Sequence, residues 1–399
     1  MHSLLFRTSI AVLTFLIGIS VATAWVFNDT DPRIEPVNIT ESRRTTPAPT
    51  LEMVFVLDTT GSMGGLLDGA KQKIWSIVND VMLTESRPAV RVGLVAYRDR
   101  GDQYVTQVLP LTSDLDQVYS ALMAYKAEGG GDTPEDVRRA LFEGVTKVGW
   151  STQSNGMAQI LFLVGDAPPH DDYSDSPDAR STAANAADLG IVVNTIQCGG
   201  IPETRTIWQA IAQKGDGQYF AIDQNGGVQT IATPYDEQMS KLANQLGGTF
   251  VAYGGGDGEA GDKNRSVARE RIARVEESVA VDAPSEAKAE RALNKAMNRE
   301  AYIGDLLQSI ENGSIQIDKI DANQLPADLR KLSPAQRKQE IEKRLAERRE
   351  LRAQIVTLSK QRAEFLAAER KKKLGAKSDA FDTAVITALK EQLKRKGIK

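Results

Sequence analysis

Short apolar runs alternate with amphipathic stretches between residues 50 and 250. Two of these runs, Val54–Leu57 and Leu161–Val164, are apolar at every position, as is typical of strands buried on both faces. The stretches between the runs have helical periodicity. Strands that alternate with helices over such a length predict a doubly wound, mostly parallel sheet with helices on both faces.

The pattern predicts six strands and six helices in this part of the chain. The strands are expected at Leu51–Leu57, Val90–Tyr97, Tyr104–Val108, Ile160–Gly165, Ile191–Gln197 and Gln218–Ile222. The helices are expected at Gly64–Leu83, Asp114–Ala127, Pro134–Val148, Asp175–Leu189, Glu203–Gln213 and Val228–Leu246. The sequence therefore predicts an α/β domain with a six-stranded sheet over residues 50–250.

Beyond residue 250 the pattern changes. Clustered glycines and charges predict a flexible linker over residues 251–283. Residues 284–399 are rich in Ala, Glu, Lys, Arg and Leu, and predict an α-helical, coiled-coil-like extension. Ser333-Pro334-Ala335-Gln336 is a typical helix start, with a capping serine and a proline in the first turn. The apolar seam that follows is short, so we favour a helical hairpin over a long coiled coil.

The N-terminus carries a targeting pattern. Two residues with basic side chains, His2 and Arg7, precede an uncharged apolar stretch, and Ala22-Thr23-Ala24 is a small-residue cleavage pattern. We expect a signal peptide at residues 1–24 and a proline-containing linker at residues 25–49. An uncleaved membrane anchor is the alternative, because the apolar stretch approaches spanning length. Either interpretation places the rest of the chain outside the cytoplasm, in the periplasm or cell envelope or secreted.

Charge is unevenly divided along the 399 residues. Residues 1–250 carry a net charge of −11 and residues 251–399 carry +7. The acidic half suits a cation site. The basic half has the charge of a solvated helical surface and lacks a nucleic-acid reading motif, so no nucleic-acid partner is predicted. The single cysteine, Cys198, is expected to be a small buried residue, and the chain has no internal disulfide.

Three segments offer oxygen ligands at predicted strand ends or in a glycine-rich loop. Asp58-Thr59-Thr60-Gly61-Ser62 closes the first apolar strand, and Asp166 follows the strand Ile160–Gly165. Thr133 follows three glycines, Gly129–Gly131. Ligands of parallel sheets bind beyond the carboxyl ends of the strands. Carboxylate and hydroxyl oxygens are what Mg²⁺ accepts, so these segments predict a magnesium site.

This set of segments resembles the metal-ion-dependent adhesion site of von Willebrand factor type A domains, over about residues 50–250. The family's first loop reads Asp-x-Ser-x-Ser, and here it reads Asp58-x-Thr60-x-Ser62, which keeps both hydroxyls. The resemblance implies metal ligation by Asp58, Thr60, Ser62, Thr133 and Asp166. The expected ion is Mg²⁺, with Mn²⁺ or Ca²⁺ as alternatives. The resemblance also implies an open coordination position that an acidic side chain of a partner fills.

Acidic residues and one histidine surround this site in the sequence. We expect His170, Asp171 and Asp132 to form a ligand-binding rim. His170 is alternatively a loop histidine with local hydrogen bonds. Acidic side chains nearby, including Asp171, are alternatively solvated loop charges or a second calcium-like site.

Three functions remain to be compared. The first is a non-enzymatic, divalent-metal-dependent binding module for a protein or an anionic ligand with an exposed carboxylate. The second is an envelope assembly scaffold that acts through its helical extension, with self-association as one mode. A metal-dependent hydrolase is the least favoured, because no Gly-x-Ser-x-Gly elbow or phosphate-binding loop occurs. We therefore expect no enzymatic activity, and we expect membrane proximity only through the N-terminus.

Overall fold

A six-stranded, mostly parallel sheet forms the first half of the molecule, as predicted. The computed structural model describes residues 49–82, 88–222, 231–282, 285–298, 300–373 and 380–398. The strands are β1 (Thr50–Asp58), β2 (Ala89–Tyr97), β3 (Thr106–Thr112), β4 (Met157–Gly165), β5 (Ile191–Cys198) and β6 (Asp216–Ile222). They lie in the order β3-β2-β1-β4-β5-β6, and only β3 is antiparallel to its neighbour.

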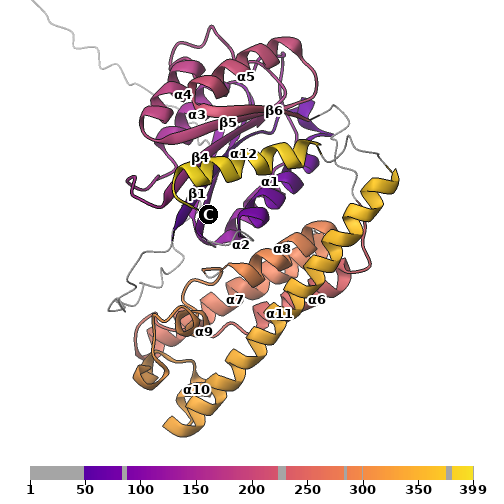
Figure 1. Cartoon of the computed structure of the whole chain (residues 1–399). Coiled ribbons are helices and arrows are strands. Elements are labelled where there is room, and N and C mark those ends of the chain that lie inside the picture. Colours follow the sequence, from indigo (N-terminus) through magenta and orange to yellow (C-terminus); the bar gives the residue numbers. More distant parts are fainter. Residues whose placement is uncertain are drawn as a thin grey trace, which may run out of the picture.

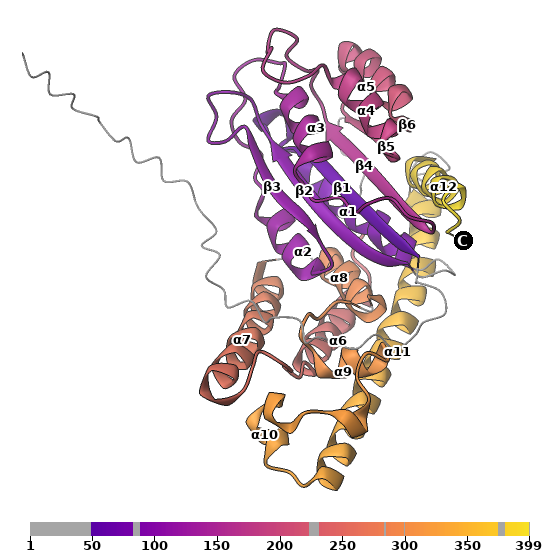
Figure 2. The same ribbon diagram turned by 90° about the vertical axis from the view of Figure 1, so that its left-hand side faces the viewer.

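Helices cover both faces of the sheet (Figure 2). One face packs against α1 (Leu67–Met82), α2 (Leu115–Ala124) and the C-terminal helix α12 (Ala380–Arg395). The other face packs against α3 (Val137–Thr146), α4 (Ala179–Asp188) and α5 (Pro202–Lys214). A short 3-10 turn, η1 (Gly61–Met63), leads from β1 towards α1.

The apolar runs of the central strands β1 and β4 are buried on both faces. In β1, Phe55 and Leu57 point into one layer, while Val54 and Val56 point into the other. Phe55 stacks on Phe162 of the neighbouring strand β4, with ring centroids 5.3 Å apart. These contacts fix the register of β1 against β4, and so fix which residues stand at the carboxyl ends of both strands.

A helical region follows β6 and has its own cores. It comprises α6 (Asp236–Gly248), α7 (Gly258–Asp282), α8 (Ser285–Met297), α9 (Leu306–Glu311), α10 (Ala327–Arg330) and α11 (Pro334–Lys373), with two 3-10 turns, η2 (Ile317–Lys319) and η3 (Ala322–Gln324). Figure 1 shows this region beside the sheet domain, with α11 running along it. α6, α8 and α11 share one apolar cluster, and α9, α10 and the first part of α11 share another.

Two boundaries differ from prediction. The linker expected at residues 251–283 is mostly the helix α7, whose apolar positions Ala268 and Ile272 pack against Phe250 and Tyr302. The helix expected to close the sheet domain is α6, and it packs in the helical region with α8 and α11. Glycines at the start of α7 and its charged surface concealed this packing in the sequence.

The long helix α11 begins as predicted but packs differently. The backbone N–H of Ser333 donates to the Gln336 side chain, and the N–H of Gln336 donates to the Ser333 hydroxyl, a reciprocal cap. Its apolar seam lies against α6 and α8, so the expected hairpin is not formed. Arg362, a charge within that seam, pairs with Asp236 of α6 at 2.8 Å and Glu290 of α8 at 2.5 Å.

The last helix, α12, returns to the sheet, where Figure 1 shows it in yellow near α1. Its apolar side chains join the core of the sheet face that α1 and α2 cover; they are Val385, Ala388, Leu389 and Leu393. Gln392 exchanges two hydrogen bonds with Asn194 of β5, at 3.1 and 2.8 Å. Residues 284–399 therefore do not form one extension. In the sequence, α6 to α11 stand between β6 and α12, which both belong to the sheet domain.

The predicted signal peptide, and all of the predicted linker except residue 49, lie outside the described residues. Within the residues that the structure describes, no helix has the length and apolar character needed to span a membrane.

Candidate functional site

Two of the predicted ligands stand at the ends of neighbouring parallel strands. Asp58 is the last residue of β1, and Asp166 directly follows β4. Leu57 is in register with Val164, so both strands end at the same edge of the sheet. Thr204 at the start of α5 donates from its hydroxyl to the backbone carbonyl of Asp166 at 3.0 Å, which fixes the second strand end.

Four predicted ligands are joined by hydrogen bonds. The Thr60 hydroxyl and the Thr60 backbone N–H both donate to Oδ1 of Asp58, at 2.6 and 2.8 Å. The hydroxyls of Thr60 and Ser62 lie 3.0 Å apart, and Ser62 donates to Oδ1 of Asp166 at 3.0 Å. Distant parts of the chain therefore bring two carboxylates and two hydroxyls together, as the sequence predicts.

Three buried polar atoms around this group have no hydrogen-bond partner in the described structure. They are Oδ2 of Asp58, the hydroxyl of Tyr97 and Oε2 of Glu135. A Cβ added to Gly165 would lie 2.9 Å from Oδ2 of Asp58 and 2.4 Å from the Tyr97 hydroxyl, so both atoms crowd this glycine. Buried polar atoms are nearly always paired, since an unpaired one costs about 1–3 kcal/mol. The orphaned oxygens and the hydroxyls beside them are a donor set that fits a hard dication such as Mg²⁺.

The carboxyl groups of the site resist ionisation without a cation. Burial, together with the charge of Asp166, raises the pKa of Asp58 to about 7. Burial raises the pKa of Asp166. Burial and the charge of Asp58 raise the pKa of Glu135 to about 9. A bound dication would reverse these shifts, because its charge favours the carboxylate forms.

The glycine-rich loop lies directly against the first loop. The backbone N–H of Gly61 donates to the carbonyl of Gly129 at 3.0 Å. Gly129 and Gly130 have φ angles of +78° and +80°, which glycine adopts readily. Asp102 accepts a hydrogen bond from the Gly130 N–H at 2.9 Å and so anchors the loop.

Thr133, the fifth predicted ligand, is exposed, and no hydrogen bond joins it to this group among the described residues. The buried side chain from this segment is Glu135. A Cβ built on Gly130 would lie 3.3 Å from Oε1 of Glu135 and 3.4 Å from Cβ of Thr60, so Glu135 and the first loop both lie close to Gly130. The sequence analysis missed Glu135, because its position just before a helix is shared by many surface acids.

Two of the predicted rim residues meet a residue that the sequence analysis missed. His170 and Asp132 lie with Asp99, which follows β2 after Arg98. The third rim residue, Asp171, is exposed, and its backbone carbonyl accepts from Arg138 at 3.0 Å. Asp99 could have been found by the reasoning that identified Asp58, since β2 is the parallel neighbour of β1 and ends at the same edge.

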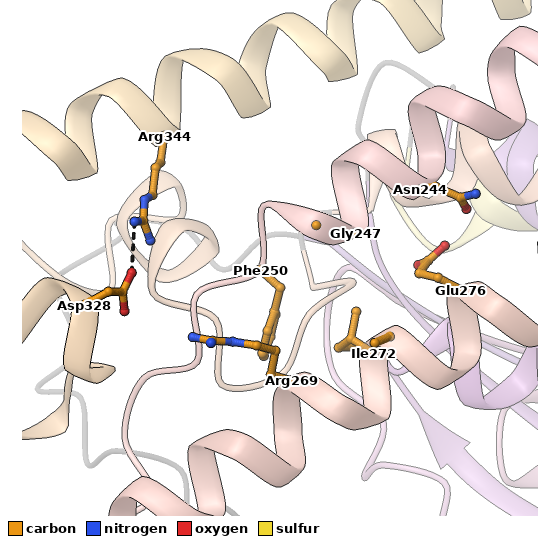
Figure 3. A pocket seen from close by; sticks show the side chains of 10 residues that line it. Asn244, Gly247, Phe250, Arg269, Ile272, Glu276, Asp328 and Arg344 are labelled. Carbon is orange, nitrogen blue, oxygen red and sulfur yellow. Dashed lines mark hydrogen bonds and ion pairs between the residues drawn. The ribbon is translucent and has the colours of Figure 1, made fainter.

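Cys198 is a buried free cysteine, as predicted, and burial raises the pKa of its thiol. A separate hollow of about 600 Å³ lies in the helical region. Arg269 and Ile272 of α7, Arg344 of α11 and Asp328 of α10 line it, with Phe250 (Figure 3). Arg344 is paired there with Asp328 at 3.0 Å.

Comparisons with known proteins agree with this fold. Residues 52–234 match the family model described as von Willebrand factor A domain. A curated relative, the putative ariadne-like RING finger protein R811 of Acanthamoeba polyphaga mimivirus, is 29% identical over 120 residues, which are 30% of this chain. The chain spans only 11% of that relative's length.

Two similar solved structures are of bacterial proteins. The conserved hypothetical protein BatB from Bacteroides thetaiotaomicron is 19% identical, with a TM-score of 0.34, over 44% of this chain and 90% of that one. The pilus adhesin SpaC from Lactobacillus rhamnosus GG, in its open conformation, is 15% identical, with a TM-score of 0.34, over 45% of this chain and 29% of that one. From the family match and the observed sheet, residues 52–234 of this chain are a von Willebrand factor A domain.

Proposed function

We propose that this protein is a divalent-metal-dependent binding module that works outside the cytoplasm. One observation carries the proposal: Asp58, Thr60, Ser62 and Asp166 form a connected group at one edge of the sheet, with a buried, unpartnered oxygen on Asp58. These residues would hold Mg²⁺, or else Mn²⁺ or Ca²⁺, together with Thr133. The ion would supply an open coordination position for a carboxylate of a protein or another anionic ligand.

The role of the chain's own residues follows from their contacts. The hydrogen bonds of Thr60 hold Asp58 at the strand end, and Ser62 ties this loop to Asp166. The hydrogen bond between Gly61 and Gly129 keeps the glycine-rich loop, which carries Thr133, at the same edge. Such preorganisation lowers the cost of capturing an ion and a partner, because little of the site has to be ordered on binding.

The test begins with the ion. We expect electron paramagnetic resonance to show that Mn²⁺ binds the full chain at one tight site, from which Mg²⁺ displaces it. Asp58→Asn should lose this site, because it removes the charge of the more buried of the two carboxylate ligands. Asp68→Asn is the matched control, since the Asp68 side chain is 85% exposed in the first turn of α1. Equal Mn²⁺ affinity in Asp58→Asn and the native chain would contradict the proposal.

The second step concerns the partner. Proteins captured by the native chain from a cell-envelope extract in Mg²⁺ should be released by a chelator and absent with Asp58→Asn. We also propose that the chain is not an enzyme. His170, the only histidine besides His2, has Nδ1 2.9 Å from a carboxylate oxygen of Asp172, and no nucleophile elbow accompanies it. Phosphatase or esterase turnover that depends on Mg²⁺ and on Asp58 would overturn this.

An assembly scaffold is the second candidate, favoured by the hollow in the helical region. Arg269 on its wall has no ion pair among the described contacts, and Arg344 faces the same space. Glu276 and Asp328 also line the hollow, so the charges of its wall balance. A polar segment of an envelope protein or of a second copy, with one carboxylate placed against Arg269, would suit it. Binding that survives Asp58→Asn but is lost in Arg269→Ala would favour the scaffold over the metal site.

A further inference from the structure

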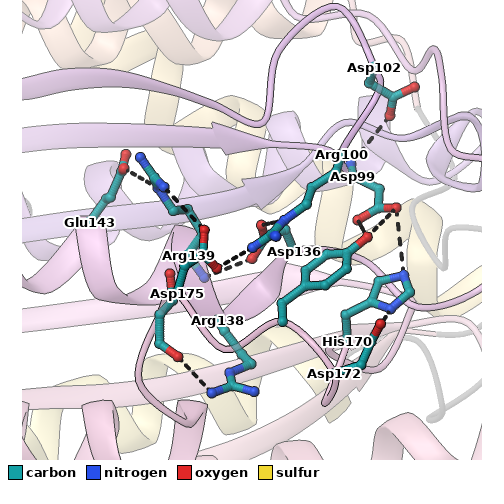
Figure 4. Close-up of polar contacts among 12 residues, drawn as sticks. Asp99, Arg100, Asp102, Asp136, Arg138, Arg139, Glu143, His170, Asp172 and Asp175 are labelled. Carbon is teal, nitrogen blue, oxygen red and sulfur yellow. Dashed lines mark hydrogen bonds and ion pairs between the residues drawn. The ribbon is translucent and has the colours of Figure 1, made fainter.

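Three metal-ligating side chains meet at the rim, outside the group around Asp58. Nε2 of His170 lies 3.6 Å from Oδ2 of Asp99 and 3.6 Å from Oδ1 of Asp132. The three ligand atoms lie within 4.8 Å of one another. They come from the loop after β2, the loop after the three glycines and the loop after β4, so the fold brings together three distant segments. Figure 4 shows two of the three, with the His170 ring beside the Asp99 carboxylate.

The spacing is too wide for hydrogen bonds. Protein N–H···O bonds have donor–acceptor distances of about 2.7–3.2 Å. Nε2 of His170 is buried and has no hydrogen-bond partner in the described structure, although two carboxylates face it. In a tetrahedral site, ligand atoms that each lie about 2.0–2.2 Å from one Zn²⁺ ion are spaced about 3.3–3.6 Å apart. The gap between these atoms is therefore close to what a shared ion requires.

The neighbouring groups orient the three side chains. Nδ1 of His170 lies 2.9 Å from Oδ1 of Asp172; as a donor there, it would leave Nε2 free to act as a ligand. The hydroxyl of Tyr173 donates to the carboxylate of Asp99 at 3.1 Å, and the Tyr173 ring stacks on the His170 ring at 4.2 Å. The Arg100 guanidinium covers the Tyr173 ring at 3.7 Å. This arrangement matches the carboxylate–histidine–metal pattern, which acidic clusters by chance do not supply.

We propose that Asp99, Asp132 and His170 form a second divalent-cation site, selective for a transition-metal ion such as Zn²⁺. A neutral imidazole with two carboxylates carries a charge of −2, which matches a dication. Imidazole nitrogen suits Zn²⁺ better than Mg²⁺ or Ca²⁺, which prefer oxygen. The Asp99 side chain is only 8% exposed and fixes one ligand, while Asp132 is 64% exposed and free to close on the ion. Water would complete the shell at the open side.

The test uses the full, untagged chain in excess Mg²⁺, which occupies the oxygen-rich group first. Zn²⁺ titrated by calorimetry should bind with a stoichiometry of one. Co²⁺ in its place should give absorption bands of a low-symmetry site with a nitrogen ligand. His170→Gln and Asp132→Asn should each lower the affinity for Zn²⁺ by more than 100-fold. This exceeds the roughly 10- to 100-fold loss that is typical when a residue that orients a ligand is changed. The loss of Zn²⁺ affinity in Asp172→Asn should fall within that smaller range, because Asp172 orients His170.

Asp171→Asn is the matched control, because it removes one carboxylate from the same exposed loop outside the trio. Its Zn²⁺ affinity should equal that of the native chain, as should that of Asp58→Asn. Unchanged Zn²⁺ affinity in His170→Gln, or loss of the Zn²⁺ site in Asp58→Asn, would overturn the proposal. Asp132→Asn guards against misfolding, because the side chain it changes is exposed, and its circular dichroism should match that of the native chain.

Discussion

At the scale of single residues, the candidate site has more buried negative charge than its hydrogen bonds can balance. Asp58 and Glu135 each keep one buried oxygen without a partner, and their pKa values rise to about 7 and about 9 because burial and neighbouring carboxylates oppose ionisation. A plain strand-to-helix turn would need no such crowding. The unbalanced charge is therefore a local cost to stability that a cation would remove.

This cost predicts a pH dependence in the metal-free protein. A carboxyl whose pKa is higher in the folded than in the unfolded chain binds more protons when folded, so stability falls as pH rises between the two values. For Glu135 that window runs from its ordinary value of 4.5 to about 9. In the presence of a chelator, the midpoint of thermal unfolding of the native chain should fall as the pH rises through this window. The midpoint of Glu135→Gln should fall less over the same range.

Added Mg²⁺ provides the check on this prediction. An ion at the site should raise the midpoint of the native chain most at the alkaline end, where the carboxylates are ionised and repel each other. Parallel midpoint curves for Glu135→Gln and the native chain in chelator would show that Glu135 does not carry the effect.

At the scale of elements, the sequence predicts the strands well and their helical partners less well. A run such as Val54–Leu57, apolar at every position, is typical of a strand buried on both faces, so its structure and its layer follow together. For a helix, periodicity indicates an apolar face but not what covers it. α6 lies largely within the helix predicted at Val228–Leu246, yet it packs away from the sheet. α12 lies within the predicted helical extension, yet it packs on the sheet.

The place of α12 gives a second prediction. Gln392 of α12 and Asn194 of β5 exchange two buried hydrogen bonds, and Asn194 also accepts from the Gln218 N–H at 2.9 Å. Gln392→Leu leaves the Asn194 side-chain NH₂ group without its partner in the core, which should cost about 1–3 kcal/mol of unfolding free energy. Urea unfolding of the full chain measures this loss.

Glu391→Ala is the control for that measurement, because Glu391 is exposed on the same helix. It should change the unfolding free energy by less than about 0.5 kcal/mol. If Gln392→Leu were as mild as Glu391→Ala, α12 would not be an integral part of the sheet domain.

At the scale of the whole molecule, the helical region docks on the end of the sheet domain opposite the candidate metal site. α1 starts beside the site and runs back along the sheet, and Asn79 in its last turn donates to Glu290 of α8 at 2.6 Å. Asp116, in the first turn of α2, pairs with Arg291 of α8 at 2.6 Å. The docked helices therefore leave the metal-site edge open to a partner.

How far the sequence predicts the site follows from the same geometry. Asp58, Thr60, Ser62 and Asp166 were found because strand ends gather at one edge of a parallel sheet. Thr133 and Glu135 were not distinguished, because the path of a glycine-rich loop depends on contacts such as Asp102 with Gly130. The buried ion pairs of the docked helices were also not predicted, since charged helical sequences are usually solvated.

The buried arginine at this docked end supports the last prediction. Arg291 lies between Asp116 and Glu276, at 2.6 and 2.9 Å, and all three side chains are largely shielded from water. Burial alone would raise the pKa of Asp116, but the charges of Arg291 and Lys295 hold it below its ordinary value. Arg291→Met would leave two buried carboxylates undercompensated, at a cost of about 3–5 kcal/mol.

A double variant separates lost charge balance from lost packing. Asp116→Asn combined with Arg291→Met removes one of the two undercompensated carboxylates. The double variant should therefore have a higher unfolding free energy than Arg291→Met alone. Mn²⁺ affinity should stay native in both variants wherever they are folded, because the docked end and the metal-site edge are separate. A loss of Mn²⁺ affinity in the folded double variant would instead mean that docking of α8 and the conformation of the Asp58 loop are energetically coupled.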